Sequence, residues 1–365
     1  MLEKRYRLLR EFAKDLHKNQ AKTLIALTVA LIGCGQMRSF HLSQQLARAS
    51  GVLFKSALQR FYRWVHNTKF DDLACWGALA ERVLSLELKR PLIAVDWTEW
   101  HQDKRVLVAA ACVGSRAIAI FAQAFSKTDM PRSQNTRENT FIDLLTRLSK
   151  RVKKAVLIFD RGFRRVSLIK QLGWLRQPFI IRLAAKVHAR SEHYQGLLYD
   201  HPLRPGQRID LGSCELSDRF PVRIRVVGIW AHDQAEPWWM ATNLSVSLKR
   251  VGQFYDRRMG VEEQFRDTKG ARYGVQMKWT AFQSGQAIGR IYLLTALAGV
   301  CWLVAGMLAL QGDSTLALPS KSKGPRRSVI AIGVAADLQT IQVLSWSWLR
   351  LRQFWPPVRL RKFEW

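Results

Sequence analysis

The sequence predicts a mixed α/β protein, in which a sheet containing both antiparallel and parallel strands follows a helical N-terminal segment. Three observations support this class. Apolar residues recur with helical spacing through residues 1–90, short apolar runs alternate with helical segments over residues 91–186, and residues 187–243 lose the helical period before it returns. With 365 residues and 48% hydrophobic content, the chain is long enough to bury a large core.

Residues 1–90 are predicted to form a helical, DNA-binding domain. Apolar residues recur every three or four positions in RYRLLREFAKDLHK, KTLIALTVALIG and FDDLACWGALAERVLSLEL. Two short amphipathic helices flank Gly51, which is typical of a helix-turn-helix DNA reader, although basic helix pairs also occur without that function. The basic side chains available to face solvent there are Arg48, Lys55, Arg60 and Arg63.

Residues 91–186 are predicted to begin an α/β core. PLIAVDW is a short apolar strand, and RVLVAAACV and RAIAIFAQAF are two more, separated by the turn signal Gly114-Ser115. A helix (ENTFIDLLTRLSK), a buried strand (KAVLIFD), a helix (RRVSLIKQLGWL) and a strand (PFIIRLA) follow. This order is that of the ribonuclease H-like fold, in which the first and fourth strands lie parallel.

The rest of the chain is divided into three parts. Residues 187–243, with RIDLGSCEL, VRIRVVGIW and PWWMATNL, are predicted to be a β-rich insertion. Residues 244–312 return to helix, at about 248–269 and 281–310, and complete the core. Residues 313–365 are predicted to be a basic linker followed by a Trp- and Arg-rich helix (VLSWSWLRLRQFW) and a tail.

The chain is expected to be cytoplasmic. Its N-terminus has no apolar segment of the signal-peptide type, and five cysteines are scattered without any C-x-x-C pair, as expected for free thiols. The uncharged stretch 291–310 is long enough to cross a bilayer, but we expect a helix buried in the core and no membrane partner.

The charge of the chain predicts a polyanionic partner. Lys and Arg number 58 against 28 Asp and Glu, which gives a net charge of +30 and a pI near 10.7. Because each neutralised phosphate releases counterions, this excess favours nucleic acid. A ribosome-associated or merely basic protein is the alternative, but the basic residues are interleaved with 14 Trp and 17 Phe.

Two aspartates end apolar strands of the predicted core. Asp96 ends the first strand and Asp160 the fourth, so parallel neighbours would bring both carboxylates to one edge of the sheet. Carboxylates that close repel each other, and a divalent cation would keep both ionised. The alternative is that these residues cap turns, since Asp160 begins the turn-like D-R-G.

A third carboxylate lies on the helix predicted after the insertion. At about 100° per residue, Glu262 shares a stripe with a tyrosine and three basic residues, whereas Glu263 points about 80° away from Tyr255. Such a polar stripe is either a solvated face or a functional site. Its members are Tyr255, Arg258, Glu262, Arg266 and Lys269.

These motifs together resemble the DDE transposases of bacterial insertion sequences, of the insertion-sequence-four type. The resemblance is carried by D-W at Asp96, D-R-G-F at Asp160, T-N at Thr242-Asn243 and Y-x-x-R-x-x-x-E-x-x-x-x-x-x-K from Tyr255. It covers residues 92–269 and implies cut-and-paste transposition: binding of terminal inverted repeats, strand cleavage, a hairpin intermediate and strand transfer into target DNA. It also implies a homodimer on two paired double-stranded DNA ends.

The resemblance assigns a role to each site residue. Asp96, Asp160 and Glu262 would be catalytic and would hold two Mg²⁺ ions, with Mn²⁺ as a substitute. Trp238 would stack on a base flipped from the duplex; Trp239 is the alternative, and both could instead be core residues. The rival functions are a nuclease that does not integrate and an inactive DNA-binding relative. The expected DNA contacts are Tyr255, Arg258, Arg266, Lys269, Trp238 and Arg161.

Overall fold

The computed structural model describes residues 6–86, 90–101, 103–114, 116–217, 221–270, 275–312 and 329–335. The N-terminal part is helical, as predicted. The two helices expected around Gly51 are present, and Gly51 ends the first of them in the left-handed conformation (φ +65°), which favours glycine. The helices are α2 (Arg7–Phe12), α3 (Lys18–Cys34), α4 (Ser39–Ser50), α5 (Phe54–Val65) and α6 (Asp72–Ser85).

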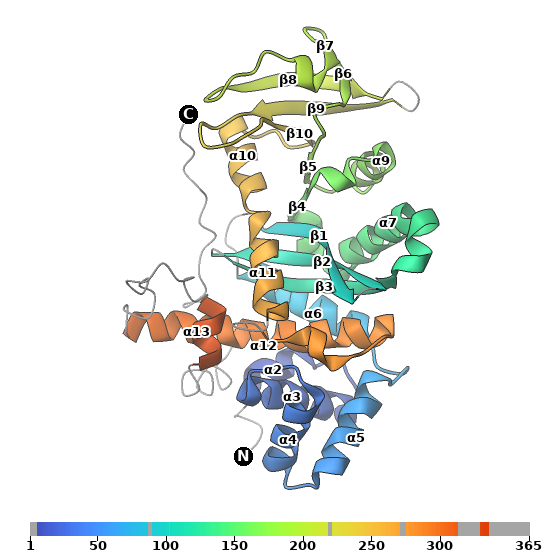
Figure 1. The fold of residues 1–365 in the computed structure, drawn as a ribbon, viewed down its shortest axis with the longest axis vertical. Helices are drawn as coiled ribbons and strands as arrows, with labels where there is room; N and C mark the ends of the chain where they lie inside the picture. The colour runs from blue at the N-terminus through green and yellow to red at the C-terminus, as the bar shows by residue number, and fades with distance from the viewer. Residues whose placement is uncertain are drawn as a thin grey trace.

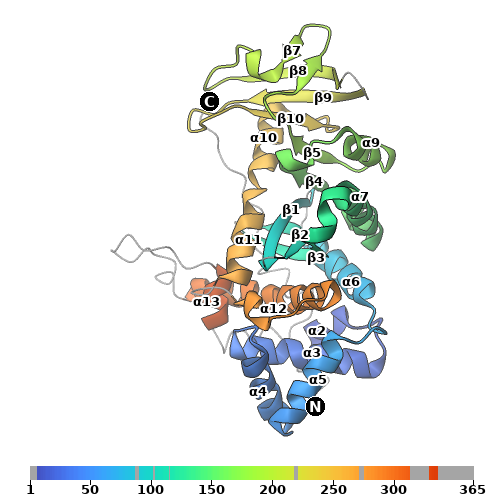
Figure 2. The same ribbon diagram turned by 45° about the vertical axis from the view of Figure 1, so that its right-hand side comes forward.

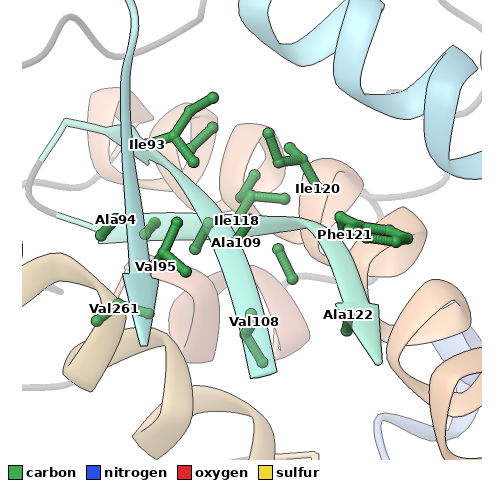
Figure 3. Close-up of a cluster of buried hydrophobic side chains, with 14 of the residues drawn as sticks. Ile93, Ala94, Val95, Val108, Ala109, Ile118, Ile120, Phe121, Ala122 and Val261 are labelled. Atoms are coloured by element: carbon green, nitrogen blue, oxygen red, sulfur yellow. The ribbon is translucent and has the colours of Figure 1, made fainter. Parts of the chain in front are cut away.

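The first four strands pair as predicted, and the structure adds the position of the fifth. The three strands β1 (Leu92–His101), β2 (Lys104–Val113) and β3 (Arg116–Ser126) are antiparallel, and β2 and β3 form the expected hairpin. The first strand pairs in parallel with β4 (Val156–Phe159), which pairs in parallel with β5 (Phe179–Arg182). Buried aliphatic side chains from β1, β2 and β3 form the core that Figure 3 shows.

The strands expected between residues 187 and 243 continue this same sheet. The last of them, β10, pairs antiparallel with β5, so the strand order is β3-β2-β1-β4-β5-β10-β9-β8-β6-β7. Figure 1 shows the sheet running through the molecule from β3 to β7. The added strands are β6 (His188–Arg190), β7 (Gln195–Leu197), β8 (Arg208–Leu216), β9 (Val222–Ile229) and β10 (Trp238–Thr242), with the 3-10 helix η3 (Leu198–Asp200).

Helices lie on both sides of the central strands. Figures 1 and 2 show α7 and α9 on one side and α10 and α11 on the other. The first group comprises η1 (Lys127–Asp129), α7 (Met130–Leu148), α8 (Lys150–Lys154), η2 (Arg161–Phe163) and α9 (Val166–Trp174). The second comprises α10 (Leu248–Asp256) and α11 (Met259–Lys269), followed by η4 (Met277–Thr280).

The single helix expected over residues 248–269 is broken between α10 and α11, which corrects that prediction. The chain tightens there: Arg257 N–H donates to the Phe254 carbonyl at 3.1 Å and Arg258 N–H to the Tyr255 carbonyl at 2.9 Å. The buried Arg257 side chain donates to the carbonyl of Gly114 in the β2–β3 turn. This turn therefore ties the helix pair to the hairpin, which the sequence pattern did not show.

The long apolar helix α12 (Gly285–Gly312) lies between the N-terminal helices and the sheet (Figure 1). By length and composition it could cross a membrane, but 83% of its most apolar window is buried within the protein. Its one charged residue, Arg290, is fully buried and donates to both Asp72 carboxylate oxygens and to the carbonyls of Trp64, Val65 and Asn67. Arg290 thus fixes the end of α5 to the core.

A short helix, α13 (Val329–Ala335), packs against α12. It lies within the stretch predicted as linker and tail, and no helix was expected there, because a seven-residue apolar segment shows too little periodicity. The predicted Trp- and Arg-rich helix lies outside the described residues. All five cysteines are free, as expected.

Candidate active site

The register of β1 and β4 brings Asp96 and Asp160 together. Val95 is paired with Phe159, so the next residue on each strand occupies neighbouring positions at the same edge of the parallel pair. One detail differs from expectation, because β1 does not end at Asp96 but continues to His101, paired with β2 alone. Asp96 therefore stands where β1 loses one neighbour rather than where it ends.

Each aspartate is oriented by a backbone N–H. Asp96 Oδ1 accepts a hydrogen bond from Trp97 N at 2.8 Å, and Asp160 Oδ1 accepts one from Gly162 N at 2.6 Å. A Cβ on Gly162 would lie 2.9 Å from that same oxygen, so a larger residue here would displace the Asp160 carboxylate. The turn-capping role considered for Asp160 is thus present, and it leaves the other carboxylate oxygen available.

Helix α11 brings Glu262 to these aspartates. The preceding residue, Val261, is fully buried against the sheet beside Ala94 and Val95 (Figure 3), which fixes the helix over β1. The guanidinium of Arg258 lies between two of the carboxylates: Nη1 is 2.9 Å from Asp96 Oδ2 and Nη2 is 2.9 Å from Glu262 Oε1. Asp96, Arg258 and Glu262, all three predicted site residues, are therefore in contact with one another through the guanidinium.

The electrostatics of this site favour a positive charge. Burial, together with the charges of Asp160 and Glu262, raises the pKa of Asp96 to about 6, although Arg258 and the Trp97 N–H act in the opposite direction. Burial acts to lower the pKa of Arg258, but Tyr255 and the carboxylates outweigh it and raise that pKa. Among the described residues, no group of three or more His, Cys, Asp or Glu side chains is arranged to hold a metal ion.

An aromatic and basic wall adjoins the carboxylates. Tyr255 is buried, which raises its pKa, and its ring lies edge-on to that of half-buried Trp238 with centroids 5.0 Å apart. The guanidinium of Arg182, at the end of β5, lies 6.0 Å from the Trp238 ring centroid. Trp239 points to the other face of β10 and is buried in the core, in contact with His201. The structure thus distinguishes the two tryptophans.

Three predicted DNA contacts lie at different distances from this centre. Lys269 Nζ donates to Thr98 Oγ1, two residues along β1 from Asp96, and so remains close to the site. Arg161 is exposed, with Nη1 3.8 Å from Glu236 Oε1. The prediction that Arg266 lies on the same helix face as Arg258 is wrong, because its side chain turns outward and pairs with Glu263. The reason is that Glu263 is itself held by Arg116 on β3.

The structure adds a buried glutamate that the sequence analysis missed. Glu138 on α7 accepts a hydrogen bond from Trp97 Nε1 at 2.8 Å through one oxygen and from Arg165 Nη2 at 2.5 Å through the other. It therefore joins the residue after Asp96 to the turn that follows Asp160. The sequence contained a sign of this role, because Glu138 shares a helical face with Phe141, Ile142 and Leu145. A charged residue among core positions indicates a buried partner.

A family model matches the part of the chain that carries the candidate site. Residues 87–295 match the family model described as the transposase DDE domain, which covers more than half of the chain and includes Asp96, Asp160 and Glu262. No curated protein matches the chain at a significant level.

We predict that Glu138→Gln lowers the free energy of unfolding by roughly 3 kcal/mol, because it leaves the Arg165 guanidinium buried without its counter-charge. Urea unfolding at neutral pH measures this. Glu215→Gln is the matched control, since the Glu215–Arg190 pair is more exposed and should contribute no more than about 1 kcal/mol. Equal losses in the two variants would contradict the role of Glu138.

We also predict that Asp96→Asn stabilises the protein at pH 8 in the presence of a chelator. The raised pKa means that the folded state holds the Asp96 proton more tightly, so stability is lost as the pH rises through about 6. Asparagine cannot ionise, so Asp96→Asn avoids this loss of stability, which amounts to up to about 3 kcal/mol. Urea unfolding should show the advantage at pH 8 and none below pH 4, whereas exposed Asp15→Asn should show little at either pH. A destabilised variant at pH 8 would refute the inference.

Proposed function

The chain belongs to the transposase DDE domain family, and on that premise we propose that it moves an insertion sequence by cut-and-paste transposition. The proposed steps are recognition of terminal inverted repeats, strand cleavage, a hairpin intermediate and strand transfer into target DNA. The observation that carries the proposal is the convergence of three carboxylates from separate elements: the β1–β4 register places Asp160 beside Asp96, and Arg258 joins Asp96 to Glu262.

The sheet order supports a ribonuclease H-like core. The order β3-β2-β1-β4-β5, with β4 and β5 parallel to β1, is the arrangement expected for that fold. We propose residues 91–186 and 244–312 as this core, with residues 1–90 as a DNA-binding domain, 187–243 as an insertion and 313–365 as a C-terminal segment. The strands of the insertion extend the core sheet and bring Trp238 beside Tyr255.

The chemistry of the carboxylates suits divalent metal ions. Asp96, Asp160 and Glu262 supply only hard oxygen donors, and Asp96 and Glu262 already pair with the Arg258 guanidinium, so the site accepts positive charge. Two Mg²⁺ ions, or Mn²⁺ in their place, would stabilise the attacking and leaving oxygens of the phosphodiester. In this arrangement Arg258 would release the carboxylates and turn to a DNA phosphate, which a guanidinium binds in bidentate fashion.

The surrounding residues are proposed to grip and distort the DNA. Lys269 and Arg161 would contact phosphates near the scissile bond, and Arg266, which is exposed, would do so farther away. Trp238 is the better of the two tryptophans for stacking on a flipped base, because Trp239 is enclosed in the core. Tyr255 supports the Trp238 ring edge-on. We propose that a homodimer acts on two DNA ends in the bacterial cytoplasm.

The rival functions differ in their products. A supercoiled plasmid carrying the DNA that flanks the gene, incubated with the protein and Mg²⁺, should yield excised and integrated products. Cleavage without integration would indicate a nuclease instead, and binding without cleavage an inactive relative. The presence of all three carboxylates disfavours the inactive relative.

We predict that Asp96→Asn, Asp160→Asn and Glu262→Gln each abolish cleavage while leaving binding to the same DNA within a few-fold, because each removes a metal ligand at constant volume. Gel assays of cleavage and binding measure the two effects. Glu263→Gln is the neighbouring control and should keep cleavage, since Glu263 faces Arg116 and Arg266. An inactive Glu263→Gln that remains folded would shift the metal site to that residue.

Trp238→Ala is predicted to block hairpin formation and to leave first-strand nicking intact. Loss of base stacking costs roughly 1–3 kcal/mol, and this cost should fall on the step that requires a base out of the duplex. Gels that resolve nicked, hairpin and joined products measure each step. Trp239→Ala is the structural control and should lower stability by about 3–5 kcal/mol and depress every step alike. Normal hairpin yield from Trp238→Ala would remove this residue from the site.

A further inference from the structure

Four exposed apolar residues gather where α4 and α5 meet. Leu53 is 78% exposed, Phe40 57%, Val52 44% and Phe54 37%, and the rings of Phe40 and Phe54 touch with centroids 5.1 Å apart. We call these four residues the apolar tip. The helices α4 and α5 that carry it lie at the end of the molecule opposite β7 (Figures 1 and 2). Contiguous exposed apolar side chains of this kind mark a binding surface.

The segment of the chain that carries the apolar tip contains no acidic residue. Residues 16–70 contain eight Lys and Arg and no Asp or Glu, whereas the average of 28 acidic residues in 365 would give about four. On α5 itself, Lys55, Gln59 and Arg63 are exposed at four-residue spacing and so share one face of the helix. The helix therefore presents apolar groups at its N-terminal end and cationic and amide groups behind them.

A polar cleft runs beside this face of α5. Its volume is about 840 Å³, and α3 contributes Asn19 and Thr23 while α5 contributes Gln59 and Arg63. Arg60 Nη2 donates to Thr23 Oγ1 at 3.3 Å, which holds the two walls together. Apart from Trp64, the residues that line the cleft carry amide, hydroxyl, imidazole or basic groups, and none carries a carboxylate. Such a lining suits a phosphate chain.

The charge decides which partner fits this surface. A second copy docked tip to tip would place two acid-free, positive faces against each other, which is repulsive. Duplex DNA offers both complements at once: phosphates for the basic groups, and base edges with thymine methyl groups for the apolar ones. Recognition helices characteristically use the residues at their N-terminal ends to contact bases.

We propose that the apolar tip enters a groove of duplex DNA and reads base edges there, while Lys55 and Arg63 hold the adjacent phosphates. This inference rests on the proposed function for the identity of the substrate, and it assigns sequence recognition to the tip. Arg290, which binds the carbonyls at the end of α5, fixes the orientation of that helix relative to the core. DNA read by the tip is thereby held in a set direction from the carboxylates.

The test uses the full-length protein and a labelled duplex that the wild type selects from a random-sequence pool, beside a scrambled duplex of the same composition. Leu53→Ser should weaken binding to the selected duplex about tenfold, as the loss of one base contact does, and leave the scrambled duplex unaffected. Its salt dependence should not change, since no charge is altered. Arg63→Gln should weaken binding to both duplexes and lower the salt slope by about one.

Tyr199→Ser is the control, because Tyr199 is equally exposed but lies in η3. It should change neither duplex. The proposal is refuted if Leu53→Ser discriminates between the two duplexes as the wild type does, or if the wild type selects no sequence from the pool. It is also refuted if Leu53→Ser loses self-association in the absence of DNA and keeps its discrimination between the duplexes. Cleavage is scored separately: a protein that discriminates through Leu53 but never cuts would refute the transposase proposal alone, and one that cuts but ignores Leu53 would refute only this inference.

Discussion

The crowding of carboxylates at one edge of the sheet is the constraint around which the central part of this protein is arranged. Parallel pairing of β1 with β4 forces Asp96 and Asp160 into neighbouring positions, and α11 adds Glu262. Without compensation these charges would oppose folding, since burial alone raises the pKa of Asp96. Arg258 supplies the compensation from the N-cap of the helix that carries Glu262, four residues earlier. The cation requirement is therefore built into the folded chain.

Two other buried charges fix parts of the fold relative to one another. Glu138 accepts hydrogen bonds from Trp97, which follows Asp96, and from Arg165, which lies in the segment after Asp160. It therefore fixes the relative position of these two segments from the far side of the sheet. Arg290 does the same between α5 and the core by satisfying backbone carbonyls and Asp72. Buried ion pairs of this kind contribute little net stability, but removal of one partner is costly. Their effect is to fix geometry.

The β strands after residue 187 continue the sheet and bring an aromatic side chain to the candidate site. Because β10 joins the sheet next to β5, alternate residues point to opposite faces: Trp238 meets Tyr255 and Arg182, and Trp239 enters the core. The distinction between two adjacent tryptophans depends on which face of β10 is covered. The alternation of side chains along a strand predicts that Trp238 and Trp239 point to opposite faces. The position of β10 beside β5 decides which of the two faces the candidate site.

The sequence by itself determined the local elements and the residue types of the site. Apolar period predicted the strands and most helices, and the positions of Asp96, Asp160 and Glu262 predicted a carboxylate cluster, because these signals are local. Only the tertiary structure decided the break between α10 and α11, the outward turn of Arg266 and the pairing of Glu138. Each of these depends on a partner far away in the chain: Gly114 for Arg257, Arg116 for Glu263, and Trp97 and Arg165 for Glu138. These pairs form because the partners lie close together, and residues so far apart in the sequence become neighbours only when the chain folds.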